Sequence, residues 1–482
     1  MNVNSILNRL GTHSILVVGD LMLDRYVWGK ISRISPEAPI QILNTEREEF
    51  RLGGASNVAH NLVALGAKAE CLGVVGTDAN GKLLVRSIKG AGIGVKGVVS
   101  DRTRITPVKS RYIDSSHKQQ VLRVDEEKSN LISKETERRL IGNFNKLVKK
   151  ADIVVASDYM KGVLTESFIK TICKICKKHN KKIIINLKDP KYGKYKGATA
   201  VTANLSEAHL TSGVEIKDDK SLKTAAFELL RNLKLEFVVV TRGEKGIYLL
   251  AKNGEEIFDK AKSINVYDVT GAGDTVLAAL SLGIASGLGY EDAVHLANLA
   301  AGIVVAKVGT STVSRKEIME HNNKFSQESK IKTMPELLTA IKNIRNSSGK
   351  TIVFTNGCFD ILHPGHIKSL THAKQQGDIL VVGLNSDKSV RIIKGKTRPI
   401  FEESLRTKSL SALECVDYIV VFNEPTPEKL IHAIKPDILV KGADWRGKKV
   451  VGESFINSYG GKVVFVPLEK GISTTNIIRK LS

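Results

Sequence analysis

Short apolar runs alternate with amphipathic stretches from residue 15 to residue 306. The runs at 14–18, 198–201 and 238–240 are rich in Val, Ile and Ala, as expected of strands that are buried on both faces. Residues 166–179 and 276–284 have the spacing or the length of helices. This alternation predicts an α/β domain built on a largely parallel sheet.

The segment between residues 94 and 123 interrupts this pattern with shorter runs and charged breaks. Residues 108–113 and 120–124 each predict a strand, and together they fit a small β lid outside the main sheet. The alternative is an ordinary surface hairpin, and the pattern alone does not choose between the two.

A change of pattern near residue 320 predicts a domain boundary. Residues 320–330 are polar and poorly periodic, which is typical of a linker, and residues 334–344 predict a helix. From residue 351 onward strands and helices alternate again, which predicts a second, Rossmann-like parallel sheet. We therefore expect a first domain at 1–318, a linker at 319–348 and a second domain at 349–482.

Length and composition agree with two ordinary globular domains. The chain has 482 residues, enough for two separate cores, with 42% hydrophobic and 26% charged residues. The five cysteines are scattered, so a disulfide framework is not expected. Cys173 and Cys176 form a C-x-x-C inside a predicted helix, which favours an incidental pair over a redox or metal site. Without a leader or an apolar stretch of ~18 residues, we expect a cytoplasmic protein without a membrane partner.

The formal net charge of +23, from 73 Lys and Arg against 50 Asp and Glu, raises the question of a nucleic-acid partner. The lysines are dispersed through predicted helices and turns, and aromatic residues make up only 5% of the chain. No array of aromatics for base stacking accompanies the charge. We therefore expect anionic small substrates and no specific nucleic-acid partner, although weak binding at low salt is compatible with the charge.

The stretch Asp268–Thr275, with the sequence DVTGAGDT, carries the strongest chemical signal. Gly271, Ala272 and Gly273 allow the backbone to approach a phosphate, and the helix predicted after them would direct its N–H groups at that anion. Asp274 would lie at the mouth of this anion hole. A carboxylate there can accept the proton of an attacking hydroxyl during phosphoryl transfer.

Other motifs appear in a recognisable order around this stretch. Asp20 follows the first apolar run, a Gly-Gly pair precedes Asn57, Asn204-Leu205-Ser206-Glu207 follows the run at 198–201, and Thr241 opens a glycine turn. With these motifs in order, residues 15–314 resemble the ribokinase (PfkB) family of sugar kinases. The resemblance implies a ribokinase-like fold whose lid covers the sugar and often makes a dimer, so we expect a homodimer.

The resemblance also implies roles for individual residues. Asp274 would be the catalytic base, and Glu207 would act on Mg²⁺ indirectly. The implied ATP-binding residues are Asn204, Leu205, Ser206, Glu207, Thr241, Gly243, Gly246, Gly271, Ala272 and Gly273. The implied sugar-binding residues are Asp20, Asp24, Gly53, Gly54, Asn57 and Lys161. Lys161, Lys109 and Arg111 are also candidates to hold a phosphate already present on the sugar, with solvated surface charges as the alternative.

A second chemical signature lies in the second predicted domain. A strand at 351–357 runs into a glycine turn, and His363-Pro-Gly-His366 follows at the start of a predicted helix. Late in the chain, Ser473, Thr474 and Thr475 open a further helix, and helix N-termini of this kind suit a polyphosphate. The two motifs together resemble the nucleotidyltransferase family that activates small phosphorylated compounds.

This second resemblance implies that His363 and His366 stabilise a pentacoordinate α-phosphorus without a covalent enzyme nucleophile. The implied ATP-binding residues are Thr355, Asn356, Gly357, Phe359, Lys441, Ser473, Thr474 and Thr475. Arg398 and Arg406 are weaker candidates for phosphate contacts.

The combination of the two domains resembles the bifunctional heptose enzymes of Gram-negative bacteria over nearly the whole chain. The strings at 19–26, 32–39 and 355–366 are specific to that resemblance. It implies ATP with Mg²⁺ as cofactor, heptose phosphates as substrates, a separate phosphatase acting between the two steps, and a product for the lipopolysaccharide core. Two alternatives remain open: a kinase–cytidylyltransferase acting on another sugar or polyol phosphate, and a chain in which one domain is a non-catalytic scaffold.

Overall fold

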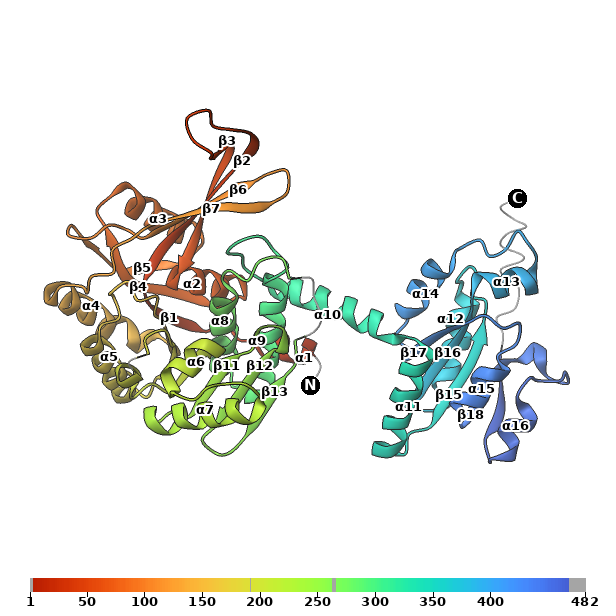
Figure 1. Ribbon diagram of the computed structural model, residues 1–482. Coiled ribbons are helices and arrows are strands. Elements are labelled where there is room, and N and C mark those ends of the chain that lie inside the picture. Colours follow the sequence, from red (N-terminus) through yellow and green to blue (C-terminus); the bar gives the residue numbers. More distant parts are fainter. Residues whose placement is uncertain (1–2, 191, 262–265, 468–482) are drawn as a thin grey trace. The chain divides into compact units, whose positions relative to one another are not determined.

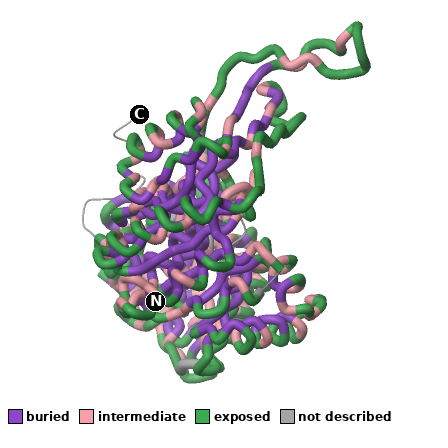
Figure 2. The backbone as a smooth tube through the Cα atoms, turned by 90° about the vertical axis from the view of Figure 1, so that its left-hand side faces the viewer, coloured by how far each residue is buried: buried purple, intermediate pink, exposed green. Residues whose placement is uncertain are grey.

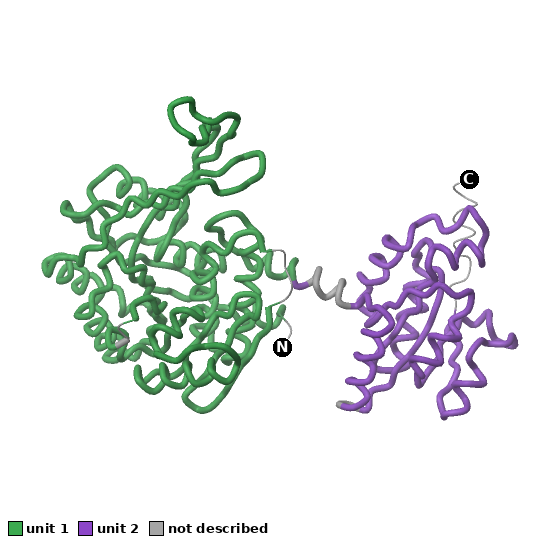
Figure 3. The backbone as a smooth tube through the Cα atoms, viewed as in Figure 1, with its two compact units in different colours: residues 1–321 green, residues 322–482 purple. Residues whose placement is uncertain are grey.

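The computed structural model describes residues 3–190, 192–261 and 266–467 (Figure 1). The chain divides into two compact units, residues 1–321 and 322–482 (Figure 3). The boundaries at 1–318, 319–348 and 349–482 stay a prediction. The expected ATP-binding residues Ser473, Thr474 and Thr475 lie outside the described residues.

The first unit is built on a sheet that is parallel except at one edge, where β12 and β13 run antiparallel. In pairing order its described strands are β13 (Glu256–Asp259), β12 (Ile247–Ala251), β11 (Phe237–Thr241), β10 (Ala200–Asn204), β9 (Lys182–Asn186), β8 (Ile153–Ser157), β1 (Ser14–Gly19), β4 (Lys68–Gly76) and β5 (Gly94–Asp101). The helices are α1 (Val3–Arg9), α2 (Ala55–Ala64), α3 (Ala79–Gly90), α4 (Lys134–Leu147), α5 (Glu166–Lys178), α6 (Leu205–Ser212), α7 (Asp219–Leu233), α8 (Ala272–Ala285), α9 (Tyr290–Val304) and α10 (Arg315–Lys330).

Helices cover both faces of this sheet, which explains why its strands are apolar on both sides (Figures 1 and 2). Successive residues of β1 show the consequence. Val17 packs into the core that α2, α8 and α9 form, whereas Leu16 and Val18 pack into the core that α4, α5 and α7 form. The expected α/β architecture is confirmed.

A second, four-stranded sheet forms a lid with the strand order β3-β2-β6-β7 (Figure 1). The expected strands are confirmed as β6 (Val108–Asp114) and β7 (Gln119–Glu126). The other two, β2 (Leu21–Ile34) and β3 (Gln41–Gly54), were not predicted. Much of β3 is exposed and charged, so it lacks the alternation that marks a half-buried strand (Figure 2).

The second unit is built on a parallel sheet, as expected. Its described strands pair in the order β14 (Ile331–Lys332), β17 (Tyr418–Phe422), β16 (Ile379–Asn385), β15 (Ile352–Gly357), β18 (Ile438–Gly442) and β19 (Lys462–Val466). Its helices are α11 (Met334–Ser348), α12 (Pro364–Lys374), α13 (Asp387–Lys394), α14 (Glu403–Ser411), α15 (Glu428–Ile434) and α16 (Glu453–Ser458).

The segment expected to be a linker is largely helical. Residues 320–330 belong to α10, whose sequence is mostly polar, although its Ile318 is buried in the core of the first unit. Leu337 and Ile341 of α11 are buried in the core of the second unit. The polar, poorly periodic sequence of residues 320–330 therefore forms a helix.

Cys173 and Cys176 lie on the buried face of α5 and are both free. Burial raises the pKa of each thiol to about 12, so neither forms a thiolate readily. This environment favours the interpretation of the C-x-x-C as an incidental pair in a helix. Among the described residues, none of the helices combines the length and the apolar character that a membrane span requires.

Candidate active sites

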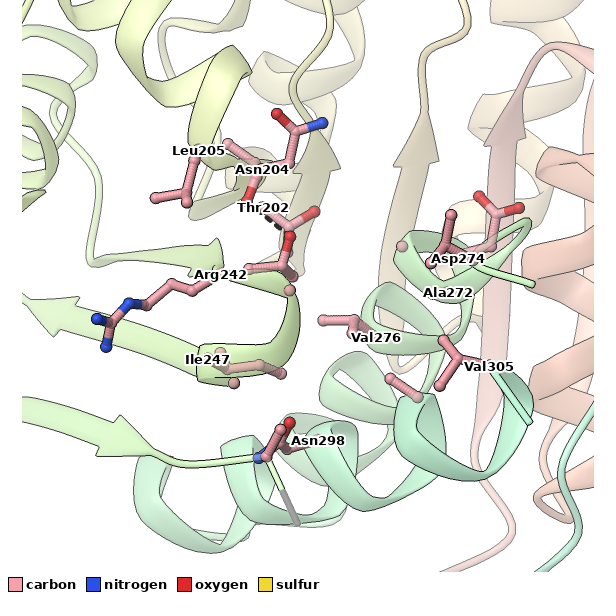
Figure 4. Close-up of a pocket in the computed structure, with 18 of the residues that line it drawn as sticks. Thr202, Asn204, Leu205, Arg242, Ile247, Ala272, Asp274, Val276, Asn298 and Val305 are labelled. Carbon is pink, nitrogen blue, oxygen red and sulfur yellow. Dashed lines mark hydrogen bonds between the residues drawn. The ribbon is translucent and has the colours of Figure 1, made fainter. Parts of the chain in front are cut away.

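A cavity of about 1300 Å³ opens at the carboxyl ends of the first unit's parallel strands (Figure 4). Ligands of open α/β sheets bind at this edge. The cavity brings together the residues that the sequence assigned to the nucleotide: Asn204, Leu205, Ser206, Glu207, Thr241, Gly243, Gly246, Gly271, Ala272 and Gly273. Asp274 lies on the same wall.

The first turn of α8 forms one end of this cavity. Gly271 precedes the helix in the left-handed conformation, with φ 81°, which suits glycine. A Cβ at Gly271 would lie 2.9 Å from Nδ2 of Asn57, so a larger residue would also displace that amide. The helix N-terminus faces the cavity, where it can stabilise the negative charge of a phosphate.

Asp274 is 2% exposed and receives a hydrogen bond on each carboxylate oxygen. Nδ2 of Asn57 donates to Oδ2 over 2.8 Å, and the Tyr159 hydroxyl donates to Oδ1 over 2.8 Å. Burial raises the pKa of Asp274 to about 6, although both donors and the Lys188 ammonium act against this shift. A carboxylate with this pKa is mostly ionised at neutral pH and can still accept a proton from a sugar hydroxyl.

Two residues of this site were missed in the sequence, Tyr159 and Lys188. Each lies shortly after a buried strand, Tyr159 after β8 and Lys188 after β9. Both line the cavity, and the ammonium of Lys188 lies 5.8 Å from the centre of the Tyr159 ring. Their position at the carboxyl edge of the sheet was a usable signal, but neither residue stands in a short motif.

Asn204 and Glu207 form a capping box at the start of α6. Oδ1 of Asn204 accepts from the Glu207 N–H over 2.8 Å, and Oε2 of Glu207 accepts from the Asn204 N–H over 2.8 Å. Oε1 of Glu207 forms an ion pair with Lys188. The capping box therefore fixes the Glu207 carboxylate beside Lys188 at the cavity wall.

The far part of the cavity is apolar. Ile247, Val276 and Val305 come from three separate elements and lie around the same space (Figure 4). Gly246 has φ 85°, and a Cβ there would lie 2.0 Å from the carbonyl oxygen of Asp259. This turn therefore requires glycine, and the apolar surface beyond it suits the flat base of a nucleotide.

Asp24 and Asn57 are further buried side chains near Asp274. Asp24 is 3% exposed, and its Oδ1 accepts from the Arg111 guanidinium over 2.5 Å. A Cβ at Gly53 would lie 2.7 Å from Oδ2 of Asp24, and one at Gly54 would lie 2.5 Å from the Asp20 carbonyl oxygen. The Gly-Gly pair therefore permits the close packing of β2 against β3 at this point.

The carboxylate of Asp20, which we expected to bind the sugar, faces a loop. It is 1% exposed and accepts from the backbone N–H groups of Tyr159 at 2.8 Å, Lys161 at 3.1 Å and Val163 at 3.2 Å. These three bonds occupy the carboxylate within the protein. Asp20 therefore holds the loop that carries Tyr159, and its contact with the sugar stays a prediction.

Lys109 and Lys161 converge on Glu127 beside the lid. Lys109 lies 3.1 Å from Glu127 and 3.0 Å from Asp125, and Lys161 lies 2.5 Å from Glu127. The two ammonium groups lower the pKa of Glu127, although burial opposes that shift. The three candidates for a sugar phosphate contact, including Arg111, are therefore all paired with carboxylates here.

In the second unit, His363 caps the N-terminus of α12 and stacks against His366, with ring centroids 3.7 Å apart. The Nδ1 atoms of both rings are buried and have no hydrogen-bond partner among the described residues. Burial, reinforced by His363, lowers the pKa of His366 to about 4. Burial also lowers the pKa of His363, so both rings are neutral at pH 7. Their two Nδ1 atoms lie at the N-terminus of α12, where a ligand could bind them.

The end of β15 carries further residues that we expect to bind ATP. The Lys441 ammonium donates a hydrogen bond to Oδ1 of Asn356, and Oγ1 of Thr355 donates to the Val440 carbonyl over 3.0 Å. Burial lowers the pKa of Lys441 to about 8. Phe359, in a left-handed conformation with φ 43°, packs its ring at 5.2 Å from that of His366.

Arg406 has a structural role, which corrects its assignment as a phosphate contact. Its side chain is 1% exposed and donates to the carbonyls of Cys358 at 2.7 Å and Asn385 at 2.8 Å, and to Asp387 at 2.6 Å. Arg398 forms an ion pair with Asp360, which is itself 2% exposed. Both arginines therefore anchor the loops around the His363–His366 pair.

Comparison with known proteins identifies both units. Residues 12–317 match the pfkB family of carbohydrate kinases, and residues 354–480 match the cytidylyltransferase-like family. The bifunctional protein HldE of Geobacter sulfurreducens is 44% identical over 485 residues, which cover 100% of this chain and 98% of that protein. The chain belongs to the HldE family. HldE of Syntrophotalea carbinolica is 45% identical over 482 residues, with the same coverage of each chain.

Solved structures similar to this HldE-family chain confirm the fold of its first unit. Escherichia coli phosphofructokinase-2 in complex with potassium aligns with a TM-score of 0.57 and 20% identity, covering 65% of this chain and 99% of that one. Arabidopsis thaliana ribokinase, complexed with ribose and ATP, aligns with a TM-score of 0.53 and 21% identity over 65% of this chain and 99% of its own. The expected ribokinase-like fold is confirmed.

The carbohydrate kinase activity should fall as the pH is lowered through the pKa of Asp274, about 6. Only the ionised carboxylate accepts the proton of the hydroxyl, so kcat/KM should drop about tenfold per unit below that pKa. Direct measurement of ADP release between pH 4.5 and 9 tests this. An acid limb near pH 4, the ordinary value for aspartate, would contradict it.

Nucleotidyl transfer should instead fall as the pH rises through the pKa of Lys441, about 8. The ammonium form is the one that can attract a polyphosphate, and it is lost above that pKa. Pyrophosphate release from pH 6.5 to 10 measures the effect. Lys441→Arg is the matched control, because a guanidinium stays charged and should remove the alkaline limb. If the limb persists unchanged in that variant, another group causes it.

Proposed function

We propose that this chain catalyses two ATP-dependent steps of ADP-heptose biosynthesis. The first unit phosphorylates D-glycero-β-D-manno-heptose 7-phosphate at O1 to the 1,7-bisphosphate. The second unit transfers AMP from ATP to D-glycero-β-D-manno-heptose 1-phosphate, giving ADP-heptose and pyrophosphate. The observation that carries the proposal is similarity to HldE along the full chain, and the candidate groups described in each unit support it.

In the kinase step, the O1 hydroxyl of the heptose attacks the γ-phosphorus of ATP and the bond to the β-phosphate oxygen breaks. Asp274 accepts the hydroxyl proton as the new bond forms, and ADP leaves. The N-terminus of α8 stabilises the charge on the transferring phosphoryl group. Lys188, which lines the same cavity, adds a positive charge on the nucleotide side.

Mg²⁺ accompanies ATP in this proposal. No cluster of three His, Cys, Asp or Glu side chains that could hold a metal exists in the described part of the chain. Mg²⁺ keeps several waters and binds through one or two carboxylates together with substrate phosphates. Glu207, which lines the cavity beside Lys188, would contact the ion through water, and the ion would neutralise phosphate charge.

In the adenylyl step, a phosphate oxygen of the heptose 1-phosphate attacks the α-phosphorus of ATP and pyrophosphate leaves. No enzyme nucleophile takes part. In this proposal, His363, His366 and the ammonium of Lys441 stabilise the negative charge that develops; the Nδ1 atoms of both rings lack a partner among the described residues. Thr355, Asn356 and Gly357 form the end of β15, where Asn356 contacts Lys441.

Partners and location follow from this chemistry. The first product carries a 7-phosphate that the second substrate lacks, so a phosphatase must act between the two steps. We place the protein in the cytoplasm, where ATP is available, and the ADP-heptose would supply the lipopolysaccharide core. We also propose a homodimer formed through the lid, whose strands expose Ile34, Phe50 and Leu122.

The substrate assignment is tested by measuring ADP release from ATP with D-glycero-D-manno-heptose 7-phosphate, with fructose 6-phosphate and ribose as controls. We expect turnover on the heptose alone. ATP and CTP are then compared as nucleotide donors to the heptose 1-phosphate, and only ATP should release pyrophosphate. Turnover confined to a control sugar, or use of CTP, would favour a kinase–cytidylyltransferase for another sugar.

The two activities should separate by mutation. Asp274→Asn removes the proton acceptor and should reduce the kinase rate at least about 10³-fold while adenylyl transfer is unchanged. His366→Ala should reduce adenylyl transfer about 10²-fold or more and leave the kinase unchanged. Both reactions are measured on each purified variant. Loss of both activities in a folded variant would contradict two independent sites.

A further inference from the structure

The loop that follows β8 is wound tightly beside the kinase site. Met160 has φ 56°, a left-handed conformation that non-glycine residues rarely adopt, and Gly162 has φ 87°. Such a conformation persists only where surrounding contacts impose it, and it is concentrated at functional sites. The left-handed Met160 directly follows Tyr159, which lines the cavity.

Two buried carboxylates impose this conformation. Asp20 accepts from the N–H groups of Tyr159, Lys161 and Val163, as described above. Oδ1 of Asp158 accepts from the Met160 N–H over 2.9 Å, and its Oδ2 accepts from the Tyr195 hydroxyl over 2.8 Å. Every N–H from Tyr159 to Lys161 therefore has an acceptor on a side chain that is 1% exposed.

The consequence of this winding is the position of one hydroxyl. Tyr159 donates to Oδ1 of Asp274, while Asn57 donates to Oδ2. One donor on each oxygen fixes the rotation of the carboxylate, and each oxygen keeps capacity for a further hydrogen bond. A sugar hydroxyl can therefore approach a base that is already oriented.

We propose that Tyr159 is a positioning residue of the kinase site, whose hydroxyl orients Asp274 and favours its ionised form, and that Asp20 acts through Tyr159 by holding the loop. This inference deepens the proposed function and rests on the role of Asp274 as base. It assigns a positioning role to Tyr159, which stands in no short motif, and a second role to Asp20.

The charges around Asp274 agree with this role. The titratable and charged groups that face it are Asp24 on β2, Tyr159 after β8 and Lys188 after β9, which is paired with Glu207 of α6. Burial, and then the charge of Asp274, raises the pKa of Tyr159 well above its ordinary value. The phenol therefore keeps its proton and remains a donor throughout the pH range of an assay.

The test compares Tyr159→Phe with the unaltered enzyme and with Tyr248→Phe. Tyr248 is a matched control, since it is buried and its hydroxyl has no partner among the described residues. Loss of the Tyr159 donor should move the acid limb of kinase kcat/KM up by about one pH unit. The ionised fraction at pH 6.5 then falls about threefold, whereas at pH 8.5 it hardly changes. Tyr248→Phe should leave the limb in place.

A second measurement needs no substrate. The ¹³C resonance of the Asp274 carboxyl, assigned with Asp274→Asn, should titrate about one unit higher in Tyr159→Phe. The near-ultraviolet circular dichroism of the same sample, compared with that of the unaltered protein, reports whether the first unit is folded. If Tyr159→Phe does not fold, 3,5-difluorotyrosine at position 159 keeps the shape of the ring and, as a stronger donor, should shift the titration downward.

An unchanged titration in the folded Tyr159→Phe protein, or in the fluorinated one, overturns the positioning role. That outcome differs from failure of the proposed function, which would appear as an unaltered enzyme inactive on the heptose. Since the carboxyl titration is independent of the substrate, it decides the role of Tyr159 in either case.

Discussion

The buried carboxylate of Asp274 is the constraint on which the kinase site depends. Removing a charge from water is costly unless hydrogen bonds replace the lost hydration. Asn57 and Tyr159 supply two of these bonds, and both are held in turn: Asn61 donates to Oδ1 of Asn57 over 3.3 Å, and Asp20 binds the backbone of Tyr159. The packing of α2 against α8 and the winding of the loop after β8 thus serve the same carboxylate.

In both units burial shifts the pKa of a side chain at the site, upward for a carboxyl group and downward for cationic groups. In the first unit, burial raises the pKa of Asp274 and prepares a base. In the second, burial lowers the pKa of His366 and of Lys441, which weakens their positive charge before a ligand arrives. A polyphosphate would reverse that shift, because its negative charge favours the protonated forms. In the absence of substrate, the pKa values of Asp274 and Lys441 therefore lie within about one unit of pH 7, whereas the His366 ring is uncharged.

The sequence predicted those parts of the fold that bury apolar residues. Strands such as those at 14–18 and 238–240 are continuous apolar runs in the sequence, because helices cover both faces of the sheet. The strand β3 does not, since its exposed charged residues carry no such pattern. Asp274 and His363 were found because each stands in a short motif at a helix start, where the backbone itself makes the anion site.

Residues that act through tertiary contacts gave no comparable signal. Tyr159 and Lys188 reach the site from loops after β8 and β9, and only the folded sheet brings them to Asp274 and Glu207. Asp20 was assigned to the sugar because it ends a strand at the carboxyl edge, a position that serves a ligand or a neighbouring loop equally well. Its three backbone N–H partners, which belong to such a loop, are 139 to 143 residues away in the sequence.

The charge of the intermediates argues that the two sites work on free substrates. A 1,7-bisphosphate leaves the kinase site, yet the adenylyl site takes a sugar with a single phosphate at the attacking end. In the first unit, Lys109 and Lys161 around Glu127 are the candidate partners of the 7-phosphate. In the second unit, the groups described at the His363–His366 pair suit the phosphates of a nucleotide. Because the product of the first reaction carries one phosphate more than the substrate of the second, the fusion of two units ensures equal amounts of both activities without requiring direct transfer.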